Sequence, residues 1–364
     1  MIDYESYIRY GEPEKAQKAQ NWSTAIGLQK VDGLQTSGYL NDVAIRNIEG
    51  EITVEQARHL INSYYQNLSL REAVENNVEE ADRAAANINV LLAEPSFTFS
   101  VSGLAAIHRR IFEGVFKHAG KFRDYDITKK EWVLRGATVI YGMASELRAT
   151  VEYDLDREKA FSYKGLSKEA LIAHIARFIA DLWQIHPFGE GNTRTTAVFL
   201  IKYLREKGFP LDNTPFREHS WYFRNALVRA NFNDLRNGIT ADYKYLERFL
   251  SNIILGTNYP LKNRFMHLDY HHQEEDNMQT GTENLPVNLP VNLHVNLPVK
   301  QRAILDELAK NPSLTYEALA QKIGCSRETV RVHIKSLVSR GVLTRIGSDK
   351  SGHWQINQPK GGNE

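Results

Sequence analysis

Nine consecutive residues, His186 to Arg194, carry side chains suited to the transfer of a phosphoryl group. They read His-Pro-Phe-Gly-Glu-Gly-Asn-Thr-Arg. His186 is the only group in this motif that could take a proton near neutral pH, so a hydroxyl nucleophile would lose its proton to it. Glu190 offers a hard oxygen ligand for Mg²⁺, and Arg194 can make two parallel hydrogen bonds to phosphoryl oxygens. The motif thus provides a base, a metal ligand and a cationic clamp.

The glycines and the amide of the motif favour a tight loop that leads into a helix N-terminus. Pro187 ends a helix expected over residues 167–185, and a second helix is expected over 193–206. Between them, Gly191 and Asn192 let the backbone turn so that successive N–H groups and the helix dipole converge on an anion. The residues expected at this phosphate-binding loop are Gly189, Gly191, Asn192, Thr193 and Arg194.

The same motif also admits a purely structural interpretation. His186 could cap the preceding helix while Glu190 and Arg194 form an ordinary ion pair across the loop. Single histidines and single ion pairs are common and usually carry no chemistry. Their combination with an anion-binding loop within nine residues is uncommon, which favours the functional interpretation.

Most of the chain up to about residue 258 has the pattern of a helical domain. Residues 53–70 and 72–92 are rich in Ala, Glu, Leu, Gln and Arg, with apolar residues three or four positions apart. Residues 120–141 differ, because aromatic and β-branched residues gather there around a turn-like Thr-Lys-Lys-Glu at 128–131. We expect a β-hairpin at this place on a mainly α-helical body.

The composition changes abruptly after residue 258. Residues 259–299 include an Asn-Leu-Pro-Val repeat, and prolines four residues apart block a helix there. We expect a semi-rigid linker, with a strand that docks on a partner as the less favoured alternative. Residues 300–364 predict a separate α+β domain of three helices and a two-stranded hairpin. The expected boundaries are therefore 1–66, 67–258, 259–299 and 300–364.

The third helix of the C-terminal domain has the features of a DNA-contacting element. Ser326 is positioned as its N-cap, and Arg327, Arg331 and Lys335 form its basic face, as a helix entering a major groove requires. The order helix, turn, helix and hairpin resembles a winged helix-turn-helix domain. DNA binding is the favoured function, and dimerisation or protein docking is the alternative, because a fold alone does not determine function.

Composition excludes several other classes of protein. The 364 residues are 42% hydrophobic and 24% charged, which is ordinary for a globular protein, and the net charge of +1 argues against a surface that binds polyanions throughout. Cys325 is the only cysteine, so an internal disulfide is impossible. Neither a targeting sequence nor a window of about 18 apolar residues is found. We expect a soluble cytoplasmic protein without membrane partners.

The nine-residue motif resembles the signature of the Fic family, His-Pro-Phe-x-(Asp/Glu)-Gly-Asn-x-Arg, and residues 107–123 are similar to the family's helix leading into its flap. The resemblance covers about residues 70–258. It implies a helical bundle with a β-hairpin flap, and transfer of a nucleotide monophosphate, usually AMP from ATP, to a protein hydroxyl.

The resemblance also implies roles for individual residues. His186 would be the general base and Glu190 the Mg²⁺ ligand, while Arg194 would contact the β-phosphate. Gly191 and Asn192 would form the phosphate-binding loop. The core anchor would be Phe188, and the flap that aligns the target chain by strand pairing would comprise Lys130, Glu131, Trp132 and Val133.

Two departures from the family pattern concern the nucleotide and its control. Ala197 stands where many members have a second arginine that contacts the γ-phosphate, so ATP is a less secure donor. Residues 19–57 resemble the VbhA-type antitoxins that inhibit Fic enzymes by pairing a glutamate with that arginine. Asp32 is the expected inhibitory residue here, with Glu49 as a rival, and a short carboxylate facing an alanine cannot make the pair. We therefore expect auto-inhibition to be weak or steric.

Other functions stay open at this stage. The chain could be a DNA-binding regulator with a nucleotide-sensing Fic core, or a phosphate-transferring relative of Doc, although Doc-type proteins resemble Ala-Asn-Lys where this chain has Gly191-Asn192. The sequence does not identify the target protein, the modified residue type, the donor base, the DNA site or the oligomeric state, for which a homodimer is one option.

Overall fold

The computed structural model describes residues 4–67, 73–270, 299–339, 342–347 and 352–357. They form two compact units, Met1–Tyr270 and His271–Glu364, which we describe separately. The Asn-Leu-Pro-Val repeats up to residue 298 lie outside the described residues.

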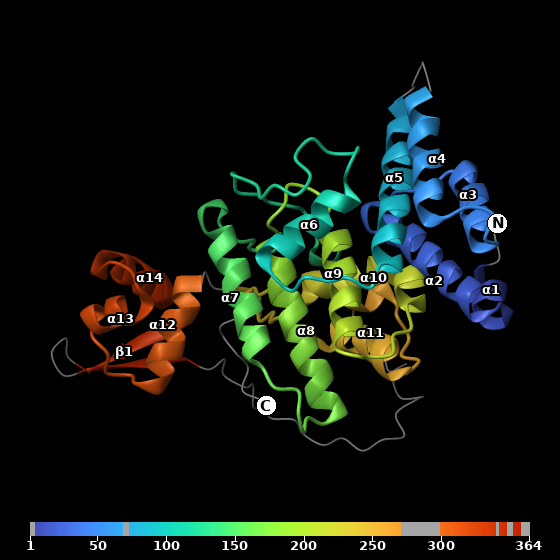
Figure 1. Ribbon diagram of the computed structural model, residues 1–364. Helices are drawn as coiled ribbons and strands as arrows, with labels where there is room; N and C mark the ends of the chain where they lie inside the picture. The colour runs from blue at the N-terminus through green and yellow to red at the C-terminus, as the bar shows by residue number, and fades with distance from the viewer. Residues whose placement is uncertain (1–3, 68–72, 271–298, 340–341, 348–351, 358–364) are drawn as a thin grey trace. The chain divides into compact units, whose positions relative to one another are not determined.

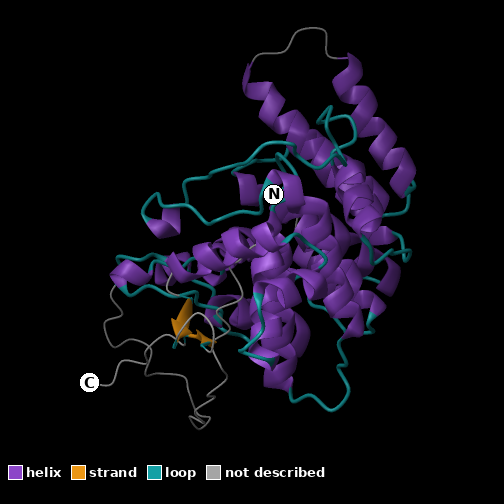
Figure 2. Ribbon diagram, turned by 90° about the vertical axis from the view of Figure 1, so that its left-hand side faces the viewer, coloured by secondary structure: helices purple, strands orange, loops and turns teal. Residues whose placement is uncertain are grey.

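The first unit is a helical bundle whose elements follow one another with short connections (Figures 1 and 2). Figure 1 shows α4 and α5 side by side as a long pair, with α8, α9, α10 and α11 gathered beside it. The α-helices are α1 (Tyr4–Tyr10), α2 (Pro13–Gly27), α3 (Gly38–Ile48), α4 (Val54–Asn67), α5 (Ala73–Ala93), α6 (Val101–Ile111), α7 (Leu147–Ala160), α8 (Lys168–Ile185), α9 (Asn192–Glu206), α10 (Thr214–Ala230) and α11 (Lys244–Leu255). The 3₁₀ helices are η1 (Leu28–Asp32), η2 (Trp132–Leu134), η3 (Ala144–Glu146), η4 (Leu235–Asn237) and η5 (Asn263–Met266).

Helices α8 and α9 position the motif between them. Ser167 caps α8, since its hydroxyl accepts a hydrogen bond from the Ala170 N–H at 3.2 Å. Helix α9 is buried along nearly its whole length, from Asn192 to Leu204, which makes it the central helix of the bundle. The loop 186–191 is therefore held at both ends by buried helices, which fixes its shape.

The N-terminal segment belongs to the same core as the rest of the first unit. Trp22 and Leu28 are fully buried, and one continuous cluster of apolar side chains extends from Ala19 to Met266. Helix α2 packs on α5 and α10, so the described part of the N-terminal segment, residues 4–66, covers a face of the bundle. The predicted boundary at residue 66 therefore does not separate two hydrophobic cores.

The predicted β-hairpin at 120–141 is not a pair of strands in the structure. No strand is assigned within these residues, and the chain reverses at Trp132–Gly136 rather than at the expected turn 128–131. The two extended arms share few backbone hydrogen bonds, such as Glu131 N–H to the Ala137 carbonyl at 2.9 Å. An isolated pair of strands is marginal in water, so this loop depends on contacts to its surroundings.

The second unit has the predicted order of three helices and a hairpin. Its helices are α12 (Val299–Lys310), α13 (Tyr316–Ile323) and α14 (Arg327–Ser339), followed by strands β1 (Leu343–Ile346) and β2 (His353–Ile356). The strands are antiparallel, with Leu343 opposite Ile356 and Ile346 opposite His353. Ser326 caps α14 as predicted, because its hydroxyl accepts the Thr329 N–H at 3.1 Å. A separate apolar cluster that includes Ile304, Ile334 and Trp354 forms its core.

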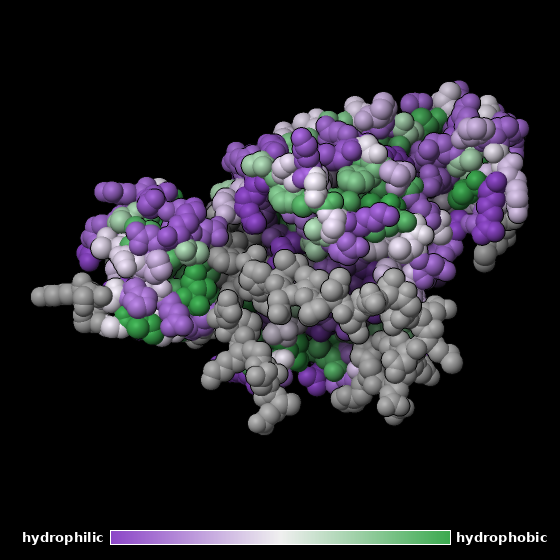
Figure 3. Space-filling model, turned by 90° about the horizontal axis from the view of Figure 1, so that it is seen from below, coloured by the Kyte–Doolittle hydropathy of each residue, from purple (hydrophilic) through white to green (hydrophobic). Residues whose placement is uncertain are grey.

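The surface seen from below alternates hydrophilic and small hydrophobic patches on both units (Figure 3). Among the described helices, none is long and apolar enough to cross a bilayer. Residue exposure in the described ranges thus follows the ordinary pattern of globular domains.

Candidate active site

His186 lies where helix α8 ends, and its environment favours a neutral imidazole. Its side chain is buried, and its Nδ1 atom lies 3.0 Å from the Trp183 carbonyl oxygen. A carbonyl can only accept, so Nδ1 carries the proton and Nε2 keeps its lone pair. Burial first, and then the nearby charge of Lys129, hold the pKa of His186 well below its usual value. The imidazole is therefore ready to accept a proton at neutral pH.

The backbone at His186 is itself unusual. Its φ of 50° lies in the left-handed region, which residues other than glycine rarely adopt. Its backbone N–H donates to the Trp183 carbonyl at 3.1 Å, so His186 also ends the helix, as the structural interpretation expected. The two roles are compatible, because the cap uses the backbone and Nδ1 while Nε2 is not involved.

Arg123 holds this strained turn from the other side. It is buried, and its Nε–H donates to the His186 carbonyl at 2.8 Å. Another N–H of its guanidinium donates to the Tyr125 carbonyl at 2.6 Å, and its backbone N–H donates to the Pro187 carbonyl at 2.9 Å. One side chain therefore ties the end of α8 to the start of the loop 120–141.

His108 fixes the position of Glu190. The Gly120 N–H donates to Nδ1 of His108 at 2.8 Å, which leaves Nε2–H to donate to the Glu190 carbonyl at 3.0 Å. Burial lowers the pKa of His108 to about 4, so the ring stays neutral and keeps this tautomer. Its ring also stacks on Phe188, with centroids 3.8 Å apart. Glu190 itself points outward, with its carboxylate 60% exposed.

The remaining loop residues give the motif a closed shape. Asn192 bonds both ways with Phe188, because its amide donates to the Phe188 carbonyl at 2.7 Å and its carbonyl accepts the Phe188 N–H at 3.0 Å. Gly191 has a φ of 72°, and a Cβ atom there would lie 2.2 Å from the Phe112 ring. Only glycine fits this position. The first-turn N–H groups of α9 point out of the helix at this loop, as an anion site requires.

Thr193 and Gly189 differ in what they offer a ligand. The Thr193 hydroxyl accepts the Trp183 indole N–H at 2.9 Å, which supports the loop from within the core. Gly189 lies beside Tyr125, whose hydroxyl would be 2.7 Å from an added Cβ. These residues remain predicted nucleotide contacts, with Thr193 available through its backbone rather than its occupied hydroxyl.

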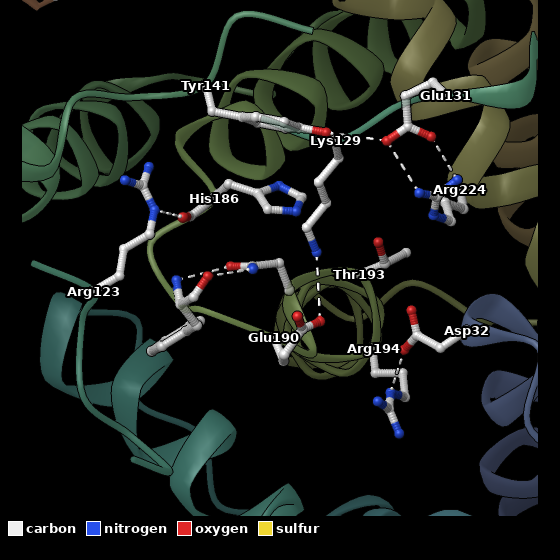
Figure 4. Close-up of polar contacts among 12 residues, drawn as sticks. Asp32, Arg123, Lys129, Glu131, Tyr141, His186, Glu190, Thr193, Arg194 and Arg224 are labelled. Carbon is white, nitrogen blue, oxygen red and sulfur yellow. Dashed lines mark hydrogen bonds and ion pairs between the residues drawn. The ribbon is translucent and has the colours of Figure 1, made fainter. Parts of the chain in front are cut away.

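Arg194 is buried and surrounded by partners from elsewhere in the chain (Figure 4). Its Nε lies 2.8 Å from a carboxylate oxygen of Asp32, although the N–H is not aimed at that oxygen, so the contact is an ion pair rather than a hydrogen bond. Its other nitrogens donate to Gln29 at 3.0 Å and to Glu80 at 2.7 Å. The guanidinium also lies over the Phe112 ring, 4.7 Å from its centroid.

These contacts add one pair and correct another. Asp32 makes no pair with residue 197, where the fully buried Ala197 lies, but it pairs with Arg194, which the sequence did not indicate. The ion pair between Glu190 and Arg194 in the structural interpretation is replaced by one between Glu190 and Lys129 at 3.5 Å. The rival residue Glu49 instead pairs with Lys15 at 2.7 Å on the N-terminal segment.

The loop 120–141 brings further charges to the motif. Lys129 extends past His186 toward Glu190 (Figure 4). Glu131 is fully buried and pairs with Arg224 of α10, with nitrogen–oxygen distances of 2.7 and 3.0 Å. The Tyr141 hydroxyl donates to Glu131 at 3.1 Å, and its ring centroid lies 4.3 Å from that of His186. The predicted flap residue Glu131 is thus an anchor of the loop, whereas Lys130 is exposed.

A cavity of about 480 Å³ opens beside the motif, within the usual size of ligand sites. Its lining combines cationic, acidic and aromatic side chains. They include Asp32, Glu80, Glu190, Arg194, Trp221 and Arg224. The predicted metal ligand Glu190 and the predicted phosphate contact Arg194 therefore line the same cavity as residues of α10.

Sequence reasoning missed several residues of this site. Among them are Gln29, Glu80, His108, Arg123, Lys129 and Arg224. One signal was present, because His108 falls on the same face of its helix as the apolar Leu104 and Ile111, where a polar residue needs a partner. The other contacts join distant segments and leave no local pattern.

The predicted DNA-contacting residues lie on one exposed side of the second unit. Arg327, Arg331 and Lys335 are all exposed on α14. Arg327 also pairs with Glu317 at 2.8 Å, which reduces its charge toward a polyanion. The three residues remain the predicted DNA contacts of this unit.

Comparison with known families and proteins follows the same division of the chain. The model of the Fic/DOC family matches residues 98–204, and that of winged helix-turn-helix DNA-binding domains matches residues 299–344. Protein adenylyltransferase VbhT of Bartonella schoenbuchensis is 27% identical over 178 residues, which cover 45% of this chain and 36% of that protein. Protein adenylyltransferase Fic of Nematostella vectensis is 28% identical over 209 residues, covering 55% and 45%. Probable protein adenylyltransferase y4lH of Sinorhizobium fredii is 28% identical over 161 residues, covering 44% and 80%. The chain thus spans less than half the length of the first two relatives.

Proposed function

This chain is a Fic-family protein with a C-terminal winged helix-turn-helix domain, and we propose that it transfers AMP from Mg²⁺-bound ATP to a side-chain hydroxyl of a target protein. Its relatives named as adenylyltransferases support Fic-type AMPylation in general. The donor nucleotide, the metal and the roles of single residues are the finer parts of the proposal.

The reaction begins when the target hydroxyl approaches the α-phosphorus of the nucleotide. Its oxygen forms a bond to that phosphorus as its proton passes to Nε2 of His186. The bond from the α-phosphorus to the oxygen bridging to the β-phosphate breaks, and pyrophosphate leaves. The products are an AMP ester of the target, pyrophosphate and a protonated His186, which then releases its proton to water.

The observation that carries the proposal is the state of His186. Its Nδ1–H is engaged with the Trp183 carbonyl, its pKa is lowered by burial, and the lone pair of Nε2 is the only basic position left on the ring. A protein that only sensed nucleotides would have no need of a neutral, oriented base. This arrangement therefore favours the enzyme over the regulator.

The metal and phosphate contacts fit the same chemistry. Mg²⁺ is commonly held by one or two carboxylates together with substrate phosphates, and the exposed carboxylate of Glu190 at the loop suits that mode. When bound, the ion would neutralise charge on the phosphates. Among the described residues, no group of three or more His, Cys, Asp or Glu side chains could bind a metal without a substrate. When a nucleotide binds, the ammonium group of Lys129 would leave the Glu190 carboxylate and pair with the phosphates instead.

The N-terminal segment regulates this site through Arg194. Asp32, Gln29 and Glu80 take up its guanidinium, so a β-phosphate must compete with two carboxylates and an amide for the same donors. Auto-inhibition in this chain therefore acts on the first arginine of the motif and does not need the arginine that is absent at residue 197.

The test is intact-protein mass spectrometry after incubation with Mg²⁺ and each of ATP, GTP, CTP and UTP. Wild-type protein is compared with His186→Ala, Asp32→Asn and, as a matched control, His59→Ala, which alters an exposed histidine on α4. We expect a gain of one AMP in wild type and His59→Ala, a larger gain in Asp32→Asn, and none in His186→Ala. Asp32→Asn replaces truncation of residues 1–66, which would expose the core.

Other outcomes would overturn parts of the proposal. A gain of one phosphate would favour the Doc-like reaction, and a gain with another nucleotide would change the donor. Addition that persists in His186→Ala would remove that residue from the reaction. An absence of any gain in wild type and Asp32→Asn, with protein substrates supplied as a cell extract, would favour the nucleotide-sensing regulator.

The second unit is proposed to bind DNA. The supporting observation is the exposed basic side of α14 with Arg331 and Lys335, together with the match to DNA-binding winged helices. The alternative is a docking module for proteins. Such a module would not release counterions from DNA, so the dependence of DNA binding on salt distinguishes the two.

A further inference from the structure

The tip of the loop 120–141 is held by a segment that follows the last helix of the first unit. This segment, Asn263–Tyr270, comprises η5 and the four residues after it, and we call it the strap. It lies beyond the region matched by the Fic/DOC family. Its side chains and backbone meet the reversal of the flap at Trp132–Gly136.

Three different contacts join the strap to the flap. The Leu268 N–H donates to the Val133 carbonyl at 3.0 Å, and the guanidinium of Arg135 donates to Asp269 at 3.0 Å. The ring of His267 lies 4.9 Å from that of Trp132, measured between centroids. Backbone, charge and ring contacts thus act on three flap residues, Trp132, Val133 and Arg135.

Arg135 has a backbone conformation that is unfavourable for an arginine. Its φ is 57°, and Arg135 and His186 are the only non-glycine residues with positive φ in the described parts of the chain. Such a conformation costs an arginine free energy that glycine would not lose. A glycine at residue 135 would adopt this conformation without that cost. The ion pair with Asp269 is a physical reason for an arginine there.

The strap itself is firmly attached to the bundle. Met266 is buried in the main core, and the Asn225 amide of α10 donates to the Asn263 side chain at 2.8 Å. The hydroxyl of Tyr245 in α11 donates to the Phe265 carbonyl. The strap therefore connects the flap to α10 and α11.

The flap arm between the tip and the motif carries the residues nearest the proposed chemistry. Glu131 is paired with Arg224, and Lys129 reaches Glu190 beside His186 (Figure 4). Trp132 stacks on Trp221, with centroids 5.2 Å apart, on the rim of the cavity. A tip released from the strap would be free to lift this arm away from His186.

We propose that the strap is a positioning element which holds the flap at the height needed to present a target hydroxyl to His186. Its consequence for catalysis rests on the proposed function, whereas its effect on the flap does not. The strap would therefore affect how the protein substrate is positioned by the flap. It would not affect nucleotide binding at Arg194, whose partners Asp32, Gln29 and Glu80 lie on other segments.

The direct test is limited proteolysis of the full chain by trypsin, scored by mass spectrometry at the flap bonds after Lys129 and Lys130. Asp269→Asn is compared with wild type and with Asp156→Asn, which removes an exposed ion pair to Lys159 on α7. Cleavage requires local opening, so its rate follows the population of released flap. We expect cleavage about two- to fivefold faster in Asp269→Asn and unchanged in Asp156→Asn.

A charge swap separates the contact from the shape of the turn. Arg135→Asp and Asp269→Arg each place like charges together and should both speed cleavage, while the double variant should return toward the wild-type rate. Arg135→Gly relieves the backbone strain but removes the contact. If the strap matters, Arg135→Gly also speeds cleavage; if only the turn matters, it slows cleavage.

The catalytic consequence is measured with α-labelled ATP, using transfer to the chain itself and to proteins of a cell extract. Released-flap variants should transfer about two- to fivefold less AMP at saturating ATP, with the ATP concentration for half-maximal rate unchanged. Equal cleavage rates in wild type, Asp269→Asn and Arg135→Gly would overturn the proposal that the strap holds the flap. Faster cleavage in the variants with unchanged AMP transfer would refute a role of the strap in catalysis. Faster cleavage in the variants of a protein whose wild type transfers no AMP would keep the strap's effect on the flap and reject the transferase activity.

Discussion

At the scale of single residues, the site depends on groups whose charge is set by their surroundings. His186 and His108 are both kept neutral by burial, with one ring nitrogen of His186 and both ring nitrogens of His108 bonded to the backbone. Their tasks differ, because His186 keeps a lone pair for a proton whereas His108 donates its remaining N–H to Glu190. The same residue type is thus proposed as the base at one position and supports the loop at the other.

The lowered pKa of His186 predicts the pH dependence of transfer. A base works only when unprotonated, so a lowered pKa keeps the rate flat down to about pH 6.5, and the rate falls only as pH drops through that lower pKa. Lys129→Met removes a positive charge that lowers the pKa, so the acidic limb should move to higher pH. The measurement is kcat/KM from pH 5 to 9.

The matched control is Lys130→Met, which removes the same charge from the exposed neighbouring residue. Its profile should overlay that of wild type. An acidic limb that stays fixed in Lys129→Met, or that moves equally in both variants, would show that the charge of Lys129 does not act on His186.

The partners of Arg194 predict release by a single conservative change. Asp32→Asn keeps the size of the side chain but removes one of two charges that hold the guanidinium. Because Asp32 is about one-third exposed, the gain is modest, and we expect the Kd for an ATP analogue to fall about three- to tenfold. Titration calorimetry measures it, with Glu49→Gln as the control on the same segment. An unchanged Kd in Asp32→Asn would argue against competition at Arg194.

At the scale of elements, the N-terminal segment is part of the bundle and also carries residues that we propose to regulate the site. Trp22 of α2 is fully buried, and its indole N–H donates to the side chain of Asn47 at 2.9 Å. The two functions are linked, because η1 carries Asp32 and Gln29 while its Leu28 and Val31 enter the core. An inhibitory residue can thus move only as far as this packing permits.

Removal of the buried indole should therefore destabilise the first unit. Trp22→Ala leaves a large cavity and an unpaired Asn47, which costs about 3 to 5 kcal/mol and lowers the Tm by roughly 10 °C. Calorimetry of the full chain measures this change. Tyr10→Ala, at a residue that is 83% exposed, is the control and should alter the Tm by no more than about 2 °C. Equal Tm values for wild type and Trp22→Ala would mean that the segment is not part of the cooperative core.

At the scale of the whole molecule, the chain combines a near-neutral total charge with a local basic side on α14. Electrostatic binding to DNA releases counterions in proportion to the phosphates contacted, so affinity should fall linearly with salt on logarithmic axes. The small number of exposed cations on this helix predicts a moderate slope. Affinity for duplex DNA should therefore fall moderately between 50 and 200 mM salt.

Substitutions on α14 test this prediction. Arg331→Ala and Lys335→Ala should each weaken binding and reduce the slope by about one. Lys310→Ala at the end of α12, where the lysine already pairs with Glu307, is the matched control. Fluorescence anisotropy of a labelled duplex at several salt concentrations measures the slope. Binding that does not change with salt, or an equal loss in Lys310→Ala, would favour a protein-docking module.

The sequence by itself determined the order of elements and located the central motif whose chemistry is proposed above. Helical periodicity, caps such as Ser167 and Ser326, and the nine residues from His186 to Arg194 are local signals, readable because each depends on neighbours a few positions away. The helical bundle and the winged helix-turn-helix domain followed from them.

Tertiary structure alone decided which groups surround that motif. The partners Gln29 and Arg194 are 165 residues apart, and Arg135 and Asp269 are 134 apart, so no local period encodes either contact. For the same reason the flap was predicted as a hairpin from its β-prone residues, whereas its actual path depends on Arg224, Trp221 and the strap. Contacts between distant segments arise only when helices pack, because packing selects among pairings that local sequence leaves equally possible.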